Sequence, residues 1–322
     1  MGRAKAPCQS SLTNQFGRVR PTVKTNSQTK VDAEARKLER QLRTQRLQEQ
    51  IGEQVAELAN SDAWQAMLDF ARRFHTYSLN NMLLILSQFP EATKVAGFRK
   101  WQSLGRQVRQ GERGIKIFGF AERRIKTSED GGSESELPER KVRFFPLLTV
   151  FDISQTDPIP GAEQPPEVAH ALVGADEAGL FSLAQRFLQE RGWPVQRQRI
   201  PGNVNGFAEM KGRRRVVIEE DLSPAQAAKT LLHEAAHVVL HADLELSATR
   251  EIRATREVEA ESVAYVVAGY FGLDTSSYTI GYVTGWSGGN VATIRSSAEN
   301  VLRGAHELVE WIEESGNQTE AA

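Results

Sequence analysis

The chain has 322 residues, about twice the length of a typical single domain, so we expect two domains. Hydrophobic residues make up 40% and charged residues 25%, which excludes a fibrous chain and a chain that is disordered throughout. The formal net charge is −1, but residues 1–155 hold 26 basic and 17 acidic residues, a net of +9, and residues 156–322 hold 14 and 24, a net of −10. Nucleic acid is therefore the first candidate partner of the basic half.

The N-terminal residues are basic without an apolar run behind them, which argues against a secretory signal. No run approaches the roughly 18 apolar residues that a membrane span needs, so we expect no membrane partner. The single cysteine, Cys8, cannot form an intramolecular disulfide. Together these features predict a protein of the reducing cytoplasm.

Helices are expected in the first part of the chain. Residues 1–30 hold six basic and no acidic residues with little apolar surface, which predicts a flexible basic arm. Apolar residues at three-to-five-residue spacing then predict one or two amphipathic helices over 31–60. Two more helices follow, one capped at Asn60 or Ser61 and one that begins near Ser78.

Strands are expected next. Residues 116–120 and 142–151 have strand character, and the polar segment 126–139 between them predicts a loop. The region 31–156 is thus a mixed α/β domain, expected to bind nucleic acid. A proline-rich linker follows at 157–170.

The second domain is expected at 171–316, where helices alternate with short strands. Ser223-Pro-Ala-Gln226 is a helix start signal with proline at the first helical position. The expected elements are helix 175–191, strands 195–200 and 214–219, and helices 224–242, 249–271 and 291–314. The fold class is therefore α+β in two domains.

The pentapeptide His233-Glu234-Ala-Ala-His237 lies on the helix expected at 224–242. Residues four apart lie one turn above each other, so both imidazoles can bind one metal ion with Glu234 beside it. The alternative is a surface helix that carries these residues by chance. The flanking Leu, Ala and Val residues argue against it, because unpartnered polar groups on a buried helix are costly.

A catalytic zinc site needs a third protein ligand. His241 lies about 12 Å of axial rise beyond His233 on one straight helix, so we interpret it as a core or supporting histidine. Glu257 and Glu261 lie one turn apart on the next helix. Glu257 is the candidate third ligand, and Glu261 the residue that orients a ligand imidazole; the alternative is a solvated acidic face.

These residues predict a Zn²⁺ cofactor and metal-assisted peptide hydrolysis. Zinc would activate a water, and Glu234 would take its proton and pass it to the leaving amine. A donor to the developing oxyanion is expected from Tyr278 or Tyr282, of which we choose Tyr282, although packing would also account for either residue.

A basic and aromatic block lies between residues 94 and 126. Basic residues that neutralise phosphates beside aromatic residues that stack on bases are typical of single-stranded nucleic-acid sites. The alternative is that Phe98, Trp101 and Phe118 are core and the basic residues form a solvated face. The candidate nucleic-acid contacts are Arg99, Lys100, Trp101, Arg106, Arg109, Arg113 and Lys116.

Several segments resemble known families. The two-His helix followed by Glu257 and Glu261 resembles the gluzincin type of zincin metallopeptidase, and LLHEAAHVVLH (231–241) with EVEAESVAYVV (257–267) is similar to the ImmA/IrrE group. YSLNNMLLI (77–85), FRKWQSLGRQVRQGERGIKIF (98–118) and VFDISQT (150–156) resemble the N-terminal domain of ArdC-type antirestriction proteins.

The ArdC resemblance implies a single-stranded-DNA-binding module followed by a metallopeptidase, and a role in antirestriction or protection of mobile elements. An unidentified protein would be the substrate. One alternative is a regulatory protease of the ImmA/IrrE kind that cleaves a DNA-bound repressor. The other is a binding protein without proteolytic activity whose zinc is structural.

Overall fold

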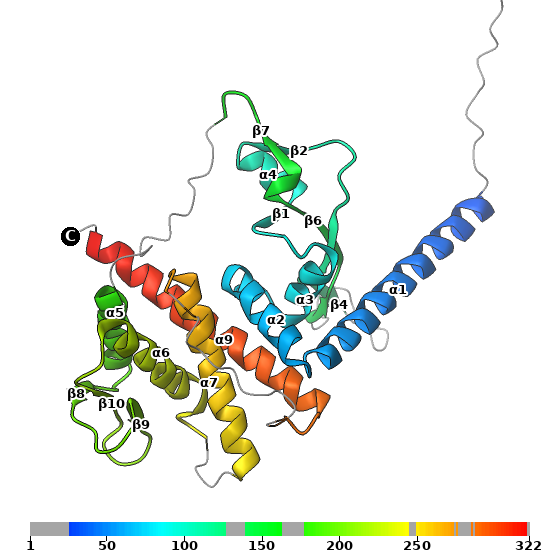
Figure 1. The fold of residues 1–322 in the computed structure, drawn as a ribbon. Helices are drawn as coiled ribbons and strands as arrows, with labels where there is room; N and C mark the ends of the chain where they lie inside the picture. The colour runs from blue at the N-terminus through cyan, green and yellow to red at the C-terminus, as the bar shows by residue number, and fades with distance from the viewer. Residues whose placement is uncertain are drawn as a thin grey trace, which may run out of the picture. The chain divides into compact units, whose positions relative to one another are not determined.

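A computed structural model describes residues 26–126, 139–162, 177–244, 249–273, 275, 285 and 287–320 (Figure 1). Most of the predicted basic arm, as well as Tyr278 and Tyr282, lies outside these residues. None of the helices in the described part of the chain combines the length and apolarity that a membrane span requires.

The chain divides into two compact units, residues 1–46 and 47–322. Helix α1 (Asn26–Glu57) is a single helix that begins within the predicted arm and covers most of the region in which one or two helices were expected. Its apolar residues differ in exposure along its length: Leu38 and Leu42 are exposed, whereas Leu47 and Ile51 are buried. Only the C-terminal part of α1 therefore contributes to the hydrophobic core of the second unit.

Two capped helices follow, as predicted. Helix α2 (Ser61–Phe74) begins after Asn60, whose side chain accepts a hydrogen bond from the backbone N–H of Asp62. Helix α3 (Leu79–Gln88) begins after Ser78, which caps it in the same way. These side chains satisfy backbone donors that a helix start leaves without partners.

The strands of the first half form short antiparallel pairings. β6 (Leu147–Asp152) lies between β1 (Val95–Gly97) and β3 (Ile115–Phe118) in a three-stranded sheet. β2 (Arg106–Val108) pairs with β7 (Thr156–Pro158), and β4 (Ala121–Lys126) pairs with β5 (Glu139–Phe144). A 3₁₀ turn, η1 (Ile153–Gln155), links β6 to β7.

The strand predicted over 142–151 is divided into β5 and β6 at Phe145-Pro146. Proline lacks the N–H that a continuous ladder needs, so the division has a local cause. Gly119 lies opposite this break. A Cβ atom there would lie 2.6 Å from Leu148 Cδ1, so a larger residue would have to displace the exposed Leu148 side chain.

The predicted nucleic-acid contact of Trp101, which lies on the short helix α4 (Phe98–Ser103), is wrong. Trp101 was expected to stack on nucleic-acid bases, but it is 0% exposed, and its indole N–H donates to the carbonyl of Phe151 at 2.8 Å. Its burial follows from this non-local partner on β6. Phe98, three residues earlier, is the exposed aromatic residue of the same helix.

Within residues 177–244, 249–273 and 287–320, the second half contains a small mixed sheet and four helices. β10 (Arg215–Glu219) lies between β8 (Val195–Gln198), which is parallel to it, and β9 (Gly206–Glu209), which is antiparallel. β9 was not predicted, because its four residues carry little of the alternation that marks a strand. The helices of this half are α5 (Glu177–Glu190), α6 (Pro224–His241), α7 (Arg250–Tyr270) and α9 (Val291–Glu320).

The two predicted domains share one hydrophobic core within residues 47–322. On α2, the Trp64 indole N–H donates to Ser262 Oγ of α7 at 3.2 Å. The guanidinium of Arg72 lies 4.2 Å from the centre of the Tyr265 ring, and the Tyr265 hydroxyl donates to Asp69 at 2.6 Å. The proline-rich region thus joins two regions that pack directly on each other.

We predict that Trp101→Ala lowers the free energy of unfolding by about 3–5 kcal/mol, because it leaves a cavity and an unpaired carbonyl. Denaturant unfolding of the full chain measures this. Phe98→Ala, on the same helix, is the control and is expected to have a small effect. A Trp101→Ala protein of unchanged stability that lost nucleic-acid binding would contradict the structural role.

Candidate metal centre and nucleic-acid interface

Helix α6 presents two histidines to the same point. The Ser223 side chain accepts from the backbone N–H of Gln226, and Pro224 occupies the first turn, so α6 begins where the sequence predicts. His233 and His237 lie one turn apart, and their Nε2 atoms are 3.1 Å from each other. The neighbouring residues Leu232, Ala235 and Ala236 are fully buried, so α6 is packed against the core on both sides of the histidines.

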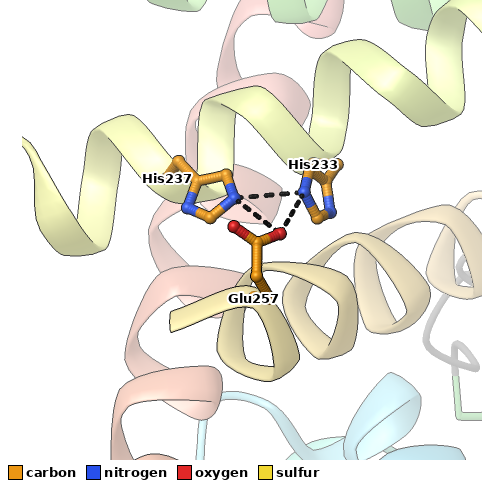
Figure 2. Close-up of side chains that lie close together, drawn as sticks. All are labelled: His233, His237 and Glu257. Carbon is orange, nitrogen blue, oxygen red and sulfur yellow. Dashed lines mark hydrogen bonds and ion pairs between the residues drawn. The ribbon is translucent and has the colours of Figure 1, made fainter. Parts of the chain in front are cut away.

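Glu257 of α7 completes a cluster of three ligand atoms (Figure 2). Its Oε2 lies 3.5 Å from Nε2 of His233 and 3.5 Å from Nε2 of His237. Ligand atoms about 2.0–2.1 Å from a tetrahedral zinc ion lie about 3.3 Å from one another. The three atoms therefore already have the separations that one zinc ion requires.

Hydrogen bonds set the tautomer of both histidines. Glu261 Oε2 lies 3.0 Å from Nδ1 of His233, so the neutral form of this imidazole carries its proton on Nδ1 and leaves the Nε2 lone pair for a metal ion. This is the arrangement that a metal ligand needs. The structure places Glu261 against His233, and its role in orienting a metal ligand stays a prediction.

His237 is oriented by a longer chain of contacts. Its Nδ1 lies 3.2 Å from Nδ1 of His241, whose Nε2 lies 2.9 Å from Glu259 Oε2. Since the carboxylate accepts the Nε2 proton of His241, the Nδ1 of His241 is the acceptor for His237. Asn300 of α9 donates to the other oxygen of Glu259 at 3.1 Å. His241 therefore supports the cluster without being part of it.

Glu259 and Asn300 are supporting residues that the sequence analysis did not identify. Glu259 is 4% exposed and lies among buried Val and Ala residues of α7. An acidic residue within an apolar helix face is a signal that could have indicated a buried partner. Asn300 gave no such signal, because its position depends on how α9 packs.

Burial lowers the pKa values of the two histidines, and hydrogen bonds to carboxylates raise them. Burial alone would lower the pKa of His233, but hydrogen bonds with Glu257 and Glu261 outweigh it and raise the pKa to about 10. The same hydrogen bonds, with His233 and His237, hold the pKa of Glu257 well below its usual range. Burial lowers the pKa of His237. The carboxylate is thus ready to bind a cation.

Glu234 lies beside the cluster and is 6% exposed. Burial raises its pKa to about 7, against the opposing effect of His233. It also accepts a hydrogen bond from the backbone of Ala208 on β9. A carboxyl group that titrates near neutral pH can both accept and return a proton.

Two hollows flank Glu234 and together form a cleft. They have volumes of about 300 and 380 Å³, and both are lined by Gly206, His233 and Glu234. β9 is one of the two edge strands of its sheet and borders both hollows. The cleft therefore gives solvent and an extended ligand access to the cluster.

The predicted nucleic-acid residues separate into two groups. Arg106 donates to the side chain of Thr156 at 2.7 Å and to its carbonyl at 3.0 Å, so it joins β2 to β7. Arg109 forms ion pairs with Glu112 at 2.8 Å and with Asp157 at 3.3 Å. Lys116 is half-buried, and its ammonium group donates a hydrogen bond to the hydroxyl of Thr149. Arg99, Lys100 and Arg113 are exposed, as is Arg109 despite its ion pairs.

A different part of the first half combines exposed aromatic and basic residues. Phe120 is 64% and Phe145 63% exposed, and their ring centres are 6.1 Å apart. On the adjacent β4–β5 hairpin, Arg124 is opposite Lys141 and Arg143 is opposite Glu122, so these side chains share one face. The sequence hid this pairing, because the segment 127–138 separates the two strands.

Comparison with known proteins supports the order of the two regions. Residues 37–151 match the model of the N-terminal domain of anti-restriction factor ArdC, and residues 189–280 match the IrrE N-terminal-like domain. These matches fall within the predicted domains 31–156 and 171–316, whose bounds stay predictions. The second match contains all three residues of the metal-ligand cluster and Glu234.

A protein of Bacillus anthracis described as uncharacterized is 26% identical over 293 residues, which is 78% of this chain and 46% of that protein. The chain thus spans about half the length of this curated relative. Crystal structures of the antirestriction ArdC protein from the R388 plasmid are also similar. The metal-free form has 19% identity and a TM-score of 0.44 over 74% of this chain and 84% of that chain. The Mn(II)-bound form has 18% identity and a TM-score of 0.43 over 72% and 84%.

We predict that Glu257→Ala abolishes stoichiometric Zn²⁺ binding and that Glu261→Ala lowers Zn²⁺ affinity by about 10–100-fold, because the His233 imidazole loses its orienting acceptor. Metal analysis and chelator competition measure these effects. Glu251→Ala, exposed at the start of the same helix, is the matched control. Stoichiometric zinc that survives Glu257→Ala would remove this residue from the ligand set.

Proposed function

We propose that this chain, which belongs to the ArdC-like antirestriction family by its two matched domains, binds single-stranded DNA and carries a zinc-dependent metallopeptidase site. The observation that carries the peptidase proposal is the cluster of His233, His237 and Glu257 at ligand separations with buried Glu234 beside it. The observation that supports DNA binding is the exposed aromatic pair beside a basic hairpin.

In the proposed reaction, His233, His237 and Glu257 hold the zinc ion. When bound, zinc lowers the pKa of a water molecule and polarises the scissile carbonyl. Glu234 accepts the proton of the attacking water at a carboxylate oxygen and delivers it to the departing amine nitrogen. Glu261 and His241 keep the two imidazoles oriented, and Tyr282 is the proposed donor to the oxyanion.

The edge position of β9 suits a peptide substrate. An extended chain can add to an exposed sheet edge through backbone hydrogen bonds. β9 borders both hollows beside Glu234, so a peptide that follows it would pass the metal ligands. The substrate that we propose is therefore an extended or locally unfolded segment of a protein.

We predict that Glu234→Gln reduces peptide hydrolysis by at least about 10²-fold while Zn²⁺ remains bound, because the amide cannot accept the proton. Hydrolysis of a fluorogenic peptide library and metal analysis of the same preparation test this. Glu220→Gln, exposed and outside the cleft lining, is the control. A Glu234→Gln protein as active as the unmodified chain would reject the mechanism.

The proposed DNA surface is built around Phe120, Phe145 and the basic face of the β4–β5 hairpin. Exposed aromatic rings can stack on bases without reading sequence, and Arg124 and Lys141 can neutralise phosphates, whereas Arg143 pairs with Glu122 at 3.3 Å. Double-stranded DNA keeps its bases stacked on each other, so this combination favours single strands. Arg99, Lys100 and Arg113 are proposed as additional phosphate contacts.

We predict that Phe120→Ala with Phe145→Ala weakens binding of a single-stranded oligonucleotide by about tenfold or more, since each stacked base contributes about 1–3 kcal/mol. Fluorescence anisotropy over a range of salt concentrations measures the affinity and the salt slope. Phe98→Ala, 44% exposed, is the matched control. Equal losses in both variants, or binding that does not depend on salt, would contradict this surface.

An antirestriction role is proposed from the family. The IrrE-like match over 189–280 favours, as a second candidate, a regulatory protease that cleaves a DNA-bound repressor. That candidate predicts cleavage of one specific protein and little affinity for naked DNA. A pulldown with Glu234→Gln, followed by the oligonucleotide assay, separates the two.

A further inference from the structure

The turn between β2 and β3 has the sequence GERG (111–114) and places an acidic residue beside a basic one in the basic half of the chain. A Cβ atom on Gly114 would overlap Cγ2 of Thr149, so the turn lies directly against β6. Glu112 is half-buried there, whereas Arg113 is exposed. The two neighbouring side chains therefore have different surroundings.

The carboxylate of Glu112 is occupied by donors of the fold itself. Its Oε1 accepts from Nε of Arg109 at 3.0 Å, and its Oε2 accepts from the side-chain amide of Gln155 at 3.1 Å. Arg109 also donates to the carbonyl of Ser154 at 2.6 Å, which fixes the guanidinium in turn. Because both oxygens have partners, the negative charge of Glu112 is largely neutralised and does not draw Arg113 into an ion pair.

Gln155 ties the turn to the buried part of the first half. It is 4% exposed, and its amide nitrogen also donates to the backbone carbonyl of Arg113 at 3.0 Å. Its amide oxygen accepts from the backbone N–H of Asp152 at 2.9 Å. Asp152 is 0% exposed, and its carboxylate accepts from the backbone N–H groups of Thr93 at 2.7 Å and Lys94 at 3.0 Å. Two buried polar side chains thus fix the backbone that carries Arg113.

Arg113 is the charged side chain of the turn that this network leaves open to solvent. Among the described residues, its guanidinium has no hydrogen-bond or ion-pair partner. A guanidinium binds phosphate oxygens through parallel hydrogen bonds. A group on a fixed backbone loses less conformational freedom on binding than one on a mobile loop. The turn therefore has the charge and the rigidity that a phosphate contact requires.

We propose that Glu112 is a positioning residue for nucleic acid: held by Arg109 and Gln155, it fixes the turn so that Arg113 contacts a phosphate of bound single-stranded DNA. The inference rests on the proposed DNA-binding function, to which it adds an acidic residue that favours binding. Charge alone gives the opposite expectation, because removal of a carboxylate near a phosphate strengthens binding. The effect of removing Glu112 therefore distinguishes positioning from charge.

The experiment measures binding of a fluorescein-labelled single-stranded oligonucleotide of mixed sequence to the full chain, by fluorescence anisotropy over a range of salt concentrations. Each phosphate contact of a single strand contributes about 0.7 to the slope of log affinity against log salt, which corresponds to about fivefold in affinity at about 0.1 M salt. We therefore expect Arg113→Ala to weaken binding by about fivefold and to reduce the slope by about 0.7. Glu112→Ala is expected to weaken binding by about threefold or more and to reduce the slope as well.

A double variant separates positioning from a general loss of structure. In the Arg113→Ala background, Glu112→Ala is expected to have no further effect on binding, because the residue through which it acts has been removed. A change that weakened the fold as a whole would lower the affinity equally in both backgrounds. Glu53→Ala, which removes the same charge from an exposed site on α1, is the matched control and is expected to leave binding unchanged.

Binding by Glu112→Ala that is as tight as that of the unmodified chain, or tighter, overturns the inference. Additive losses from Glu112→Ala and Arg113→Ala also overturn it, because Glu112 would then not act through Arg113. An unmodified chain that shows no salt-dependent binding contradicts the proposed DNA-binding function and the inference together. Salt-dependent binding that only Phe120→Ala with Phe145→Ala weakens leaves the proposed function intact and overturns the inference alone.

Discussion

The packing of α6 against α7 is the constraint on which the metal centre depends. α6 can align His233 and His237 by itself, because residues four apart share a helix face. The proposed third ligand and the two carboxylates that contact His233 and His241 come from α7, within the five residues Glu257–Glu261. Both helices carry fully buried alanines, among them Ala235, Ala236 and Ala260, and small side chains let helix backbones approach closely. A larger residue between the helices would separate Glu257 from both imidazoles.

The same packing buries polar groups that need partners. His241 and Glu259 are 6% and 4% exposed, and a buried carboxylate without hydrogen bonds is strongly unfavourable. Each group is satisfied by the next, from His237 through His241 and Glu259 to Asn300. This chain joins α6, α7 and α9, so it orients a ligand and also fixes how three helices meet. Loss of any member would leave a buried polar atom unpaired, which couples the geometry of the centre to the stability of the core.

Local patterns predicted the parts of the structure that local forces determine. The caps at Asn60, Ser78 and Ser223 lie where the sequence indicates, because a cap depends on residues within one turn. Contacts between residues that are far apart in the sequence could not be predicted from such local patterns. The burial of Trp101 depends on the carbonyl of Phe151, and the partner of Phe120 lies 25 residues later in the sequence. An aromatic residue near basic ones gives no sign of which side of a sheet it will occupy.

The distribution of charge also depends on contacts that the sequence does not reveal. The division into +9 and −10 describes the two halves, but it does not describe the surfaces that would meet a ligand. In the basic half, Arg106 and Arg109 form internal contacts, so part of its charge stabilises β2 and β7. In the acidic half, the described lining of the cleft holds as many cationic as acidic side chains, although the half as a whole is acidic. Because an ion pair weakens steeply with distance and screening, a ligand responds to these few neighbouring groups and hardly to the total.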